Sequence, residues 1–480
     1  MKKSNMIKQK IKKSIINVIG NIKEIVSATI VGSFVDSVGL KGISDIDVVI
    51  IVDQLTKNIF EDIISSFETI KGSDFGLDDH QVIINNSFGP LKFNSEKIVV
   101  FHVMIYDIEG HINHVEESPF TCFSWESFKP ISGISLRDVY PTLNLQIDDI
   151  LRSRRGLLTY LSDIEKGCIT YRKYTFNNNK LEIIKENFEL DLKHNLEYSY
   201  HITYHLLNNF YKIITRKINS IEVGDLAKFY LSFEFFPNEN LLFFENLYSW
   251  KKKGGKPPKN IISSTKLFIN DFFSFVESIK LSSKIISFRR HGKTVLNDGT
   301  FLGVKRNPSI EALSKKASDF NYEIGYHSQL LRSIETISHF NCNVLIESSL
   351  LNEIDYGLAE GLTISQLHSK FPDIILKWEE GQDPKFPEGE CQNDVLNRVH
   401  SFLNNELDIN KDSIVITHLV VLRLILFNYL NLDFKNLFKI NIEHIEGFDA
   451  LNFNQYFSIE ISKETRRRIR KQLSILGIIP

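Results

Sequence analysis

The stretch KIISFRRHGKTVLN at residues 284–297 decides the fold of the rear part of the chain. Its apolar beginning is typical of a β-strand, and Arg290, His291 and Gly292 follow where that strand is expected to end. Further on, strand-like runs such as VLIESSL and SIVIT alternate with helix-like runs such as VVLRLILFNYL. This alternation predicts a doubly wound α/β sheet, in which sites lie beyond the carboxyl ends of the strands. We therefore expect a functional site at Arg290–Gly292.

A histidine in this position can act as a nucleophile on phosphorus. A neutral imidazole attacks when its other ring nitrogen is held as a donor, and the phosphohistidine that forms divides one difficult displacement into two easier ones. The transferred phosphoryl group keeps negative charge on its oxygens and needs fixed cationic donors. Arg290 and Arg332 can supply them, the latter at the expected start of a helix in HSQLLRSIET. His418, in SIVITHLVVLR, again follows an expected strand.

The leaving alkoxide must receive a proton, and the stretch LNEIDYGLAEG offers three carboxyl groups for this step. They are Glu353, Asp355 and Glu360. The residue types and their spacing do not choose among them.

Together these segments resemble the histidine phosphatase superfamily, the phosphoglycerate-mutase-like proteins, over nearly all of residues 282–460. RHGKTVLN and SQLLRSIET match the family patterns R-H-G-x-T-x-x-N and S-x-x-x-R-x-x-x-T, and the resemblance implies a phosphatase without a cofactor. It also implies that the first glutamate of LNEIDYG is the proton donor. The implied catalytic residues are His291, Glu353, His418, Arg290 and Arg332, and the implied substrate-binding residues are Asn297, Thr294 and Glu390.

The segments LNEIDYG, FPEGE and THLVVLRLIL are most similar to the fructose-2,6-bisphosphatase branch, which implies a sugar phosphate as substrate. The loop NDGTFLGVKRNPSIEALSKKA, however, lacks the family's glycine-arginine and proline-leucine-threonine pattern. We therefore expect the substrate-facing wall beyond Asn297 to be remodelled. Mutase activity is not expected, because it needs a wall that retains the intermediate.

A second group of polar residues lies near the front of the chain, in IVGSFVDSVGLKGISDIDVVIIV at residues 30–52. Asp45 and Asp47 stand two positions apart at the start of an expected strand, so both side chains point to one face. Two such carboxylates can hold magnesium ions that bridge nucleotide phosphates, while the Gly32–Ser33 turn lets backbone donors approach. A polar cap before an apolar strand is the alternative interpretation of the two aspartates.

This segment resembles the polymerase-β-like nucleotidyltransferases over about residues 15–110, on Gly32, Ser33, Ser44, Asp45 and Asp47. The resemblance implies that the glycine-serine turn binds a nucleotide and that the two aspartates bind Mg²⁺. The family's third carboxylate belongs on a later strand, KIVVFHVMIYD, where the matching position holds His102. Asp107, the nearest acid, is taken as the third metal ligand.

The pattern predicts a multidomain α/β protein with three regions. They are a small α+β nucleotidyltransferase-like domain at 1–130, a helical domain and linker at 131–280, and a histidine phosphatase domain at 281–480. In the middle region His194, His201 and His205 fall at helical spacings and are interpreted as core or surface residues.

Composition narrows the expected partners. The 480 residues include 57 basic and 59 acidic ones, scattered along the chain, so no general field attracts nucleic acid or membrane. A small phosphate ester and a nucleoside triphosphate are expected instead. The 4 cysteines form no C-x-x-C pair, which favours a reducing cytoplasm. No run approaches the ~18 apolar residues of a membrane span, and the lysine-rich amino terminus is interpreted as an amphipathic helix.

The leading hypothesis is a bifunctional enzyme, a phosphatase acting through His291 joined to a Mg²⁺-dependent nucleotidyltransferase. In one alternative the front module binds a nucleotide without chemistry and regulates the phosphatase. In another it is a nucleotidyltransferase that modifies protein or RNA, and the rear half reverses that signal.

Overall fold

The computed structural model describes all residues except 1, 21, 37–39, 41–44, 86–96, 178–179, 190–191, 218–220, 234–235, 254–256, 314–318, 431, 433, 455 and 478–480. The contacts between residues divide the chain into two compact units, Met1–Glu277 and Ser278–Pro480. The division falls close to the boundary that the sequence suggests at 280. Residues 131–277 of the expected helical region belong to the same compact unit as the segment before them.

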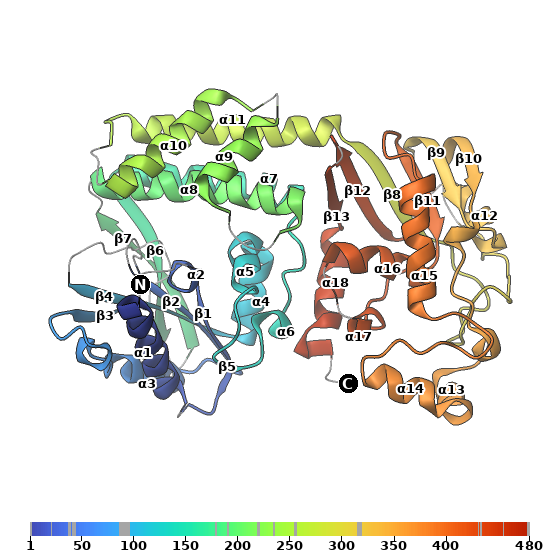
Figure 1. Ribbon diagram of the computed structural model, residues 1–480, viewed down its shortest axis with the longest axis horizontal. Coiled ribbons are helices and arrows are strands. Elements are labelled where there is room, and N and C mark those ends of the chain that lie inside the picture. Colours follow the sequence, from blue (N-terminus) through green and yellow to red (C-terminus); the bar gives the residue numbers. More distant parts are fainter. Residues whose placement is uncertain are drawn as a thin grey trace. The chain divides into compact units, whose positions relative to one another are not determined.

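The front unit is built on a mixed five-stranded sheet with the order β3-β4-β2-β1-β5 (Figure 1). Its strands are β1 (Ile25–Val31), β2 (Ile46–Val52), β3 (Gln81–Asn85), β4 (Ile98–Asp107) and β5 (Ser132–Gly133). β2 is parallel to β4 and antiparallel to β1. The two strands expected within residues 27–52 and the strand expected at 97–107 are therefore present, whereas β3 and β5 were not predicted.

The first helix packs on this sheet through one apolar edge. Helix α1 (Lys2–Ile19) buries Ile7, Ile11, Ile15 and Ile19, which recur every four residues and so lie on one face. They join one core cluster with the sheet and with α3 (Lys57–Glu68), whose first turn is capped by Thr56. Burial of each isoleucine stabilises the fold by roughly 1.5–3 kcal/mol. The amphipathic pattern of α1 therefore explains why this helix packs on the sheet.

Helices make up most of the rest of the front unit, as the pattern at 135–280 predicts (Figure 1). They are α2 (Ser33–Asp36), the 3-10 turn η1 (Gly72–Phe75), α4 (Ile108–Glu117), α5 (Pro119–Trp125), α6 (Leu136–Val139), α7 (Ile147–Glu165), α8 (Leu192–Thr215), α9 (Val223–Leu231), α10 (Asn238–Lys253) and α11 (Ile261–Ser282). Their core is aromatic, with Phe210 and Phe275 rings 5.2 Å apart. A hairpin of β6 (Cys168–Asn177) and β7 (Lys180–Glu189) interrupts the helices, and the sequence interpretation missed it.

The rear unit contains a six-stranded sheet with the order β10-β9-β11-β8-β12-β13. Its strands are β8 (Lys284–Arg290), β9 (Asn321–His327), β10 (Asn341–Glu347), β11 (Ser413–Thr417), β12 (Gly447–Phe453) and β13 (Tyr456–Glu460). The first four strands in this order are parallel, and β12 and β13 are antiparallel. The strands expected at KIISF, VLIESSL and SIVIT are present, while β9, β12 and β13 were not predicted.

The order of the strands places the rear site. From β8 the chain crosses to β9 on one side, whereas from β11 it crosses to β12 on the other. β8 and β11 are neighbouring parallel strands, so their carboxyl ends lie side by side at one edge of the sheet, where open α/β sheets form a crevice for ligands. His291 follows β8 and His418 follows β11, so both stand at this crevice.

Helices and turns cover the rear sheet (Figure 1). They are α12 (Leu331–Ile337), η2 (Ser349–Leu351), η3 (Gly357–Ala359), α13 (Ile364–Lys370), α14 (Pro372–Glu379), α15 (Gln392–Ser401), the π-helical turn η4 (Phe402–Glu406), α16 (Leu419–Leu430), α17 (Phe434–Leu437), α18 (Lys463–Leu473) and η5 (Ile475–Gly477). The most apolar of them, α16, is buried through residues such as Leu422, Leu424 and Ile425. Among the described residues, no helix combines the length and apolar character needed to cross a bilayer.

Candidate active sites

His291 lies directly after β8 and is only 3 % exposed. Its Nδ1 is 2.7 Å from the carbonyl oxygen of Gly292. Because a carbonyl oxygen can only accept, Nδ1 carries the ring proton and Nε2 keeps its lone pair. Burial and the nearby Arg332 guanidinium lower the pKa of His291 well below its usual value. The ring is therefore neutral at pH 7, as a nucleophile requires.

His418 stands beside this ring, with the two centroids 5.0 Å apart, and is fully buried. Its Nε2 is 2.7 Å from the hydroxyl of Ser328, which accepts a hydrogen bond from the Leu330 N–H. Among the described residues no other acceptor is bonded to this hydroxyl, so it donates to Nε2 and leaves the ring proton on Nδ1. That Nδ1 is itself buried and has no partner in the described part of the chain.

Arg290 and Arg332 are held by main-chain carbonyls. Arg290 donates to Ile442 at 2.8 Å, and the fully buried Arg332 donates to Gly303 at 2.9 Å. Burial lowers the pKa of Arg332 to about 10, which leaves it charged at pH 7. The Nε atoms of both arginines are buried without a partner among the described residues. With Nδ1 of His418 they give three unpaired donors beside His291, and such donors cost about 1–3 kcal/mol each unless an acceptor such as an anion engages them.

Glu353 is the acid that stands with these cationic groups. It is 5 % exposed, and burial raises its pKa against the opposing effect of Arg332 and Arg290. The other two acids of the segment are engaged by the backbone, since Asp355 accepts the Gly357 N–H and Glu360 accepts three N–H groups of residues 303–306. Glu353 itself accepts the Ile354 N–H at 3.1 Å, and its burial next to Arg332 and Arg290 favours it among the three acids.

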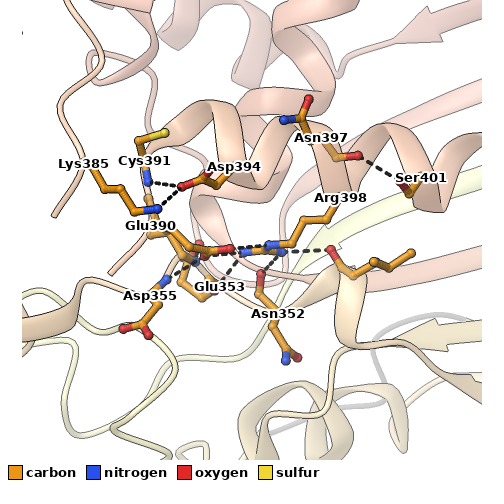
Figure 2. Close-up of polar contacts among 12 residues, drawn as sticks. Asn352, Glu353, Asp355, Lys385, Glu390, Cys391, Asp394, Asn397, Arg398 and Ser401 are labelled. Atoms are coloured by element: carbon orange, nitrogen blue, oxygen red, sulfur yellow. Dashed lines mark hydrogen bonds and ion pairs between the residues drawn. The ribbon is translucent and has the colours of Figure 1, made fainter. Parts of the chain in front are cut away.

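Arg398, on α15, fastens the backbone on which Glu353 stands (Figure 2). Its guanidinium donates to the carbonyl oxygens of Leu350, Asn352 and Glu353 at 2.9, 2.6 and 3.0 Å. One planar guanidinium thus binds three carbonyl oxygens within residues 350–353, which restricts the backbone at Glu353 and just before it. The sequence reasoning did not find Arg398, whose only signal is an arginine on a helical segment soon after FPEGE.

Glu390 completes this arrangement from the other side (Figure 2). Its two carboxylate oxygens accept from Arg398 at 3.0 and 3.1 Å, and one of them also accepts the Asp355 N–H at 2.9 Å. The expected substrate-binding residue thus uses its carboxylate to hold the 353–355 segment, directly through the Asp355 N–H and indirectly through the partly buried Arg398.

Thr294 and Asn297 form a small turn after the nucleophile. The Asn297 Oδ1 accepts both the N–H and the hydroxyl of Thr294, at 2.8 and 3.0 Å. Thr294 is 1 % exposed, so it shapes the turn. Asn297, only partly buried, keeps its amide nitrogen as the group that can reach outward.

The loop beyond Asn297 is tied to Arg332 through main-chain atoms. Arg332 donates to the carbonyl oxygens of Gly303 and Arg306, and the Glu360 carboxylate accepts the N–H groups of Gly303, Lys305 and Arg306. Arg332 and Glu360 thus hold residues 303–306 through the main chain, and a side chain of the same loop adds a contact, because Asn307 Oδ1 accepts the Leu331 N–H at 2.7 Å.

His444 is a third histidine at this site that the sequence reasoning missed. Its ring is 5.4 Å from that of His291, and its Nδ1 donates to the His291 carbonyl at 3.0 Å. It precedes the antiparallel strand β12, whose beginning lies at the same edge as the ends of the parallel strands. Because β12 itself was not predicted, nothing in the sequence pattern placed His444 there.

The front unit brings Asp45, Asp47 and His102 together. One ligand atom from each lies within 4.8 Å of the others, a spacing that fits one divalent cation. Asp47 and His102 are register partners on β2 and β4, and their side chains are 3.0 Å apart. Carboxylate oxygens suit Mg²⁺, while the imidazole nitrogen also suits Mn²⁺ or Zn²⁺.

Gly32 and Ser33 also lie at this site or next to it. Gly32 ends the turn after β1 with φ +75°, and an added Cβ would lie 2.7 Å from Asp47 Oδ2. Only glycine allows this approach. Ser33 begins α2 and is exposed, and Ser44 lies outside the described residues.

Asp107 does not belong to this cluster, which corrects the expected third ligand. It ends β4 five residues beyond His102, roughly 16 Å along a strand that rises 3.3 Å per residue. Its carboxylate instead caps α4 by accepting the Gly110 N–H at 2.7 Å. His102 occupies the place of the third acid.

A cavity of about 550 Å³ adjoins the cluster, and Asp45, Asp47 and His102 form part of its wall. The remaining wall comes from β4, α4, α5, α7 and α8. His201 and His205, interpreted from the sequence as core or surface residues, face this cavity, and their rings are 5.6 Å apart. The side chain of His194 lies outside the described part of the chain.

Two protein-family models match this chain, one in each unit. Residues 286–455 match the model of the histidine phosphatase superfamily, branch 1, and residues 12–116 match that of the nucleotidyltransferase domain. The rear unit thus contains a histidine phosphatase domain and the front unit a nucleotidyltransferase domain. This confirms the predicted families and the α/β fold class, and it supports a phosphatase and a transferase activity.

Individual relatives are distant. Phosphoserine phosphatase 1 of Hydrogenobacter thermophilus is 26 % identical over 34 % of this chain and 74 % of its own length. Fructose-2,6-bisphosphatase of Saccharomyces cerevisiae is 26 % identical over 33 % of this chain and 36 % of its own length. This chain therefore spans about a third of the second relative. The α-ribazole phosphatase structure from Shigella flexneri is 18 % identical, covers 37 % of this chain and 95 % of its own, and gives a TM-score of 0.33.

Proposed function

We propose that the rear unit transfers phosphate from a small phosphorylated metabolite to Nε2 of His291 and then to water. The observation that carries the proposal is the free Nε2 of a neutral, buried His291, next to three buried donors without partners, on Arg290, Arg332 and His418. A phosphoryl group is an anion that such donors fit, and it would meet the nucleophile among them.

In the first step a bond forms between Nε2 and phosphorus, and the bond from phosphorus to the ester oxygen breaks. Glu353, whose pKa is raised by burial, gives its proton to the leaving oxygen. In the second step water attacks the phosphohistidine, the Glu353 carboxylate takes a proton from that water, and inorganic phosphate leaves. Arg290, Arg332 and His418 stabilise the charge on the phosphoryl oxygens in both steps.

For the substrate we propose a sugar phosphate. The similarity of LNEIDYG and FPEGE to the fructose-2,6-bisphosphatase branch supports it, as does the relative of that name. The relative named a phosphoserine phosphatase provides the competing choice, so both kinds of ester belong in the test. A panel with fructose 2,6-bisphosphate, hexose monophosphates and phosphoserine should show the highest kcat/KM for a sugar ester.

The phosphatase proposal is tested by trapping the intermediate. Wild type quenched during turnover of a ³²P-labelled ester should carry phosphate that is labile to acid and stable to base, and His291→Ala should carry none. The variant should also lose more than about a thousandfold of kcat/KM. Retention of most activity by His291→Ala would overturn the proposal.

For the front unit we infer a nucleotidyltransferase with a divalent metal, Mg²⁺ being the first candidate, held by Asp45, Asp47 and His102. A metal bound there would neutralise the triphosphate and orient its α-phosphate. The chain's own contribution is the closely packed Gly32 turn, which brings backbone donors next to Asp47. We also place the protein in the cytoplasm, which the wide spacing of its 4 cysteines, without a C-x-x-C pair, supports.

A second candidate for the front unit is a nucleotide-binding regulator without chemistry. The observation that favours it is His102 in place of an acid. Pyrophosphate release should be measured for each nucleoside triphosphate with Mg²⁺ or Mn²⁺, in wild type and Asp45→Asn. Release that the variant lacks supports the transferase, whereas nucleotide binding that changes phosphatase kinetics without any release supports the regulator. Labelled nucleotide appearing on added protein or RNA would support the third reading, a macromolecule-modifying transferase.

A further inference from the structure

The cavity of the front unit has a chemistry of its own. Of its 18 lining residues only Asp45 and Asp47 are charged side chains, and neither lysine nor arginine is among them. Aromatic and aliphatic groups such as Phe120, Trp125 and Leu157 supply most of the remaining wall. Burial lowers the pKa of His205 to about 4, so this lining ring is neutral at pH 7. A volume of about 550 Å³ suits a molecule of drug-like size.

The wall discriminates between classes of ligand. A polycation would need several carboxylates beyond the pair at the metal site, and a phosphorylated molecule would need basic side chains. The described lining offers neither. An uncharged molecule with a ring or alkyl body matches both the apolar wall and the neutral imidazole of His205.

One buried acceptor in the cavity wall, the Oδ1 of Asn209, could take a hydrogen bond from a bound ligand. Asn209 lines the cavity from α8 and is 1 % exposed, and its Oδ1 has no hydrogen-bond partner among the described residues. It stands on the same helix face as His205 and His201, which lie four and eight positions earlier. An unpaired buried oxygen is costly, and a ligand hydroxyl would satisfy it.

From these observations we propose that the cavity holds the acceptor of nucleotidyl transfer, an uncharged ring-bearing alcohol that Asn209 binds through a hydroxyl group. The proposal rests on the transferase function inferred above. A hydroxyl oxygen of the acceptor forms a bond to the α-phosphorus of a nucleoside triphosphate, and the bond from that phosphorus to the pyrophosphate oxygen breaks. The hydroxyl proton goes to water, so the products are the nucleotidylated alcohol, pyrophosphate and a proton.

The test uses the full chain with His291→Ala, so that the phosphatase does not consume phosphate esters. Pyrophosphate release is measured with water alone, with the neutral aryl alcohols phenyl β-glucoside and tyrosol, with the polycation kanamycin and with glucose 6-phosphate. The neutral alcohols should stimulate release, and the other two should not. Stimulation by kanamycin or glucose 6-phosphate in place of the neutral alcohols would overturn the proposal.

A matched pair of variants tests the role of Asn209. Asn208 is also buried, at 4 % exposure, with an unpaired Oδ1, but it does not line the cavity. Asn209→Leu should raise the KM for the neutral alcohol about tenfold, the loss of one hydrogen bond to a buried group, while Asn208→Leu leaves it unchanged. In both variants the KM for the nucleotide should stay constant. Equal effects of the two substitutions would refute the assignment.

Failure of the transferase function can be told apart from failure of this proposal. Absence of pyrophosphate release under every condition, water included, removes the transferase function and the acceptor role with it. Release from the nucleotide with no preference for neutral alcohols removes the acceptor proposal alone. Calorimetric binding of tyrosol to the Asp45→Asn chain, lost on Asn209→Leu, supports the cavity as its site independently of turnover.

Discussion

The two sites of this chain handle phosphate with opposite charge. The rear site surrounds His291 with Arg290, Arg332 and His418, so the chain itself supplies the donors for an anion. The front site gathers Asp45 and Asp47 with His102, and it can receive a triphosphate only through a cation. The rear site follows the ends of β8 and β11, whereas the front site joins the start of β2 to the middle of β4, so each sheet fixes a location and the side chains decide the chemistry.

The largest effect is expected from a change of Glu353, the acid that stands among the basic groups of the rear site. Glu353→Gln should lower kcat on a sugar phosphate by about 10²–10⁴-fold, since the leaving alkoxide loses its proton donor. Hydrolysis of 4-nitrophenyl phosphate, whose leaving group needs no proton, should change little. Because burial raises the pKa of Glu353, wild-type activity on the sugar ester should persist above the usual carboxyl range and fall as pH rises through that raised pKa.

The matched control is Asp355→Asn. Its amide oxygen can still accept the Gly357 N–H, so both substrates should be hydrolysed at nearly the wild-type rate. If Asp355→Asn rather than Glu353→Gln shows the dependence on the leaving group, the proton donor has been assigned to the wrong residue.

A smaller effect is expected from Arg398, which acts on the same acid from a distance. Arg398→Lys keeps the charge but loses the fork that holds three carbonyl oxygens (Figure 2). Displacement of Glu353 by about 1 Å should lower kcat on the sugar phosphate by up to about a hundredfold, with KM nearly unchanged. The rate on 4-nitrophenyl phosphate should be spared, which separates positioning of the acid from general loss of structure.

Lys385→Ala serves as the control, because its ion pair with Asp394 is exposed (Figure 2). Such a pair is worth about 0–1 kcal/mol, and activity on both substrates should be retained. Equal losses on both substrates in Arg398→Lys would contradict the positioning role.

His111 in the front unit allows a further comparison, because it is a buried histidine that belongs to neither site. Its pKa is lowered to about 3 by burial, whereas the unfolded chain has about 6.5. The unfolded state therefore binds a proton between these values that the folded state excludes, so stability is full above pH 6.5 and is lost as pH falls. Near pH 5 the loss from this group is roughly 2 kcal/mol.

Urea unfolding at pH 7 and pH 5 checks this expectation. His111→Gln should reduce the pH dependence of the front-unit transition and leave the phosphatase rate unchanged. An unchanged pH dependence would contradict it. A lowered pKa alone therefore does not mark a catalytic histidine, and the unpaired donors around His291 make the difference.

The smallest expected effect concerns Asp107. Asp107→Ala should destabilise the front unit by about 1 kcal/mol through loss of the α4 cap, and Mn²⁺ affinity measured by calorimetry should not change. His102→Ala should weaken Mn²⁺ binding instead. Loss of Mn²⁺ binding in Asp107→Ala would restore the original choice of third ligand.

The sequence predicted those elements whose pattern is local. KIISF and SIVIT are short apolar runs before catalytic-type residues, and they are strands β8 and β11. The hairpin β6–β7 was not predicted, because its strands contain many charged residues and lie between long helices. β12 and β13 were not predicted, because their place at the antiparallel edge of the sheet depends on pairing with β8. A local sequence pattern does not contain that information.

The site residues divide in the same way. His291 and Glu353 stand in motifs, so the sequence could propose them. His444 and Arg398 reach the site from segments without a motif, through pairing with β8 and through the turn of α15. His102 was noticed but passed over for Asp107, because residue type was weighed above register, and register with Asp47 is what decides proximity.

The backbone attachment of the loop at residues 303–306 has a consequence for how this phosphatase can diversify. Arg332 and Glu360 grip the loop only by carbonyl oxygens and N–H groups, which every sequence of the loop except one with proline at a donor position would provide. Substitutions of the side chains at residues 303–306 can therefore leave these main-chain contacts of Arg332 in place. Substrate preference and phosphate capture are separately evolvable in this unit, so a family pattern can disappear from the loop while the chemistry beside it is conserved.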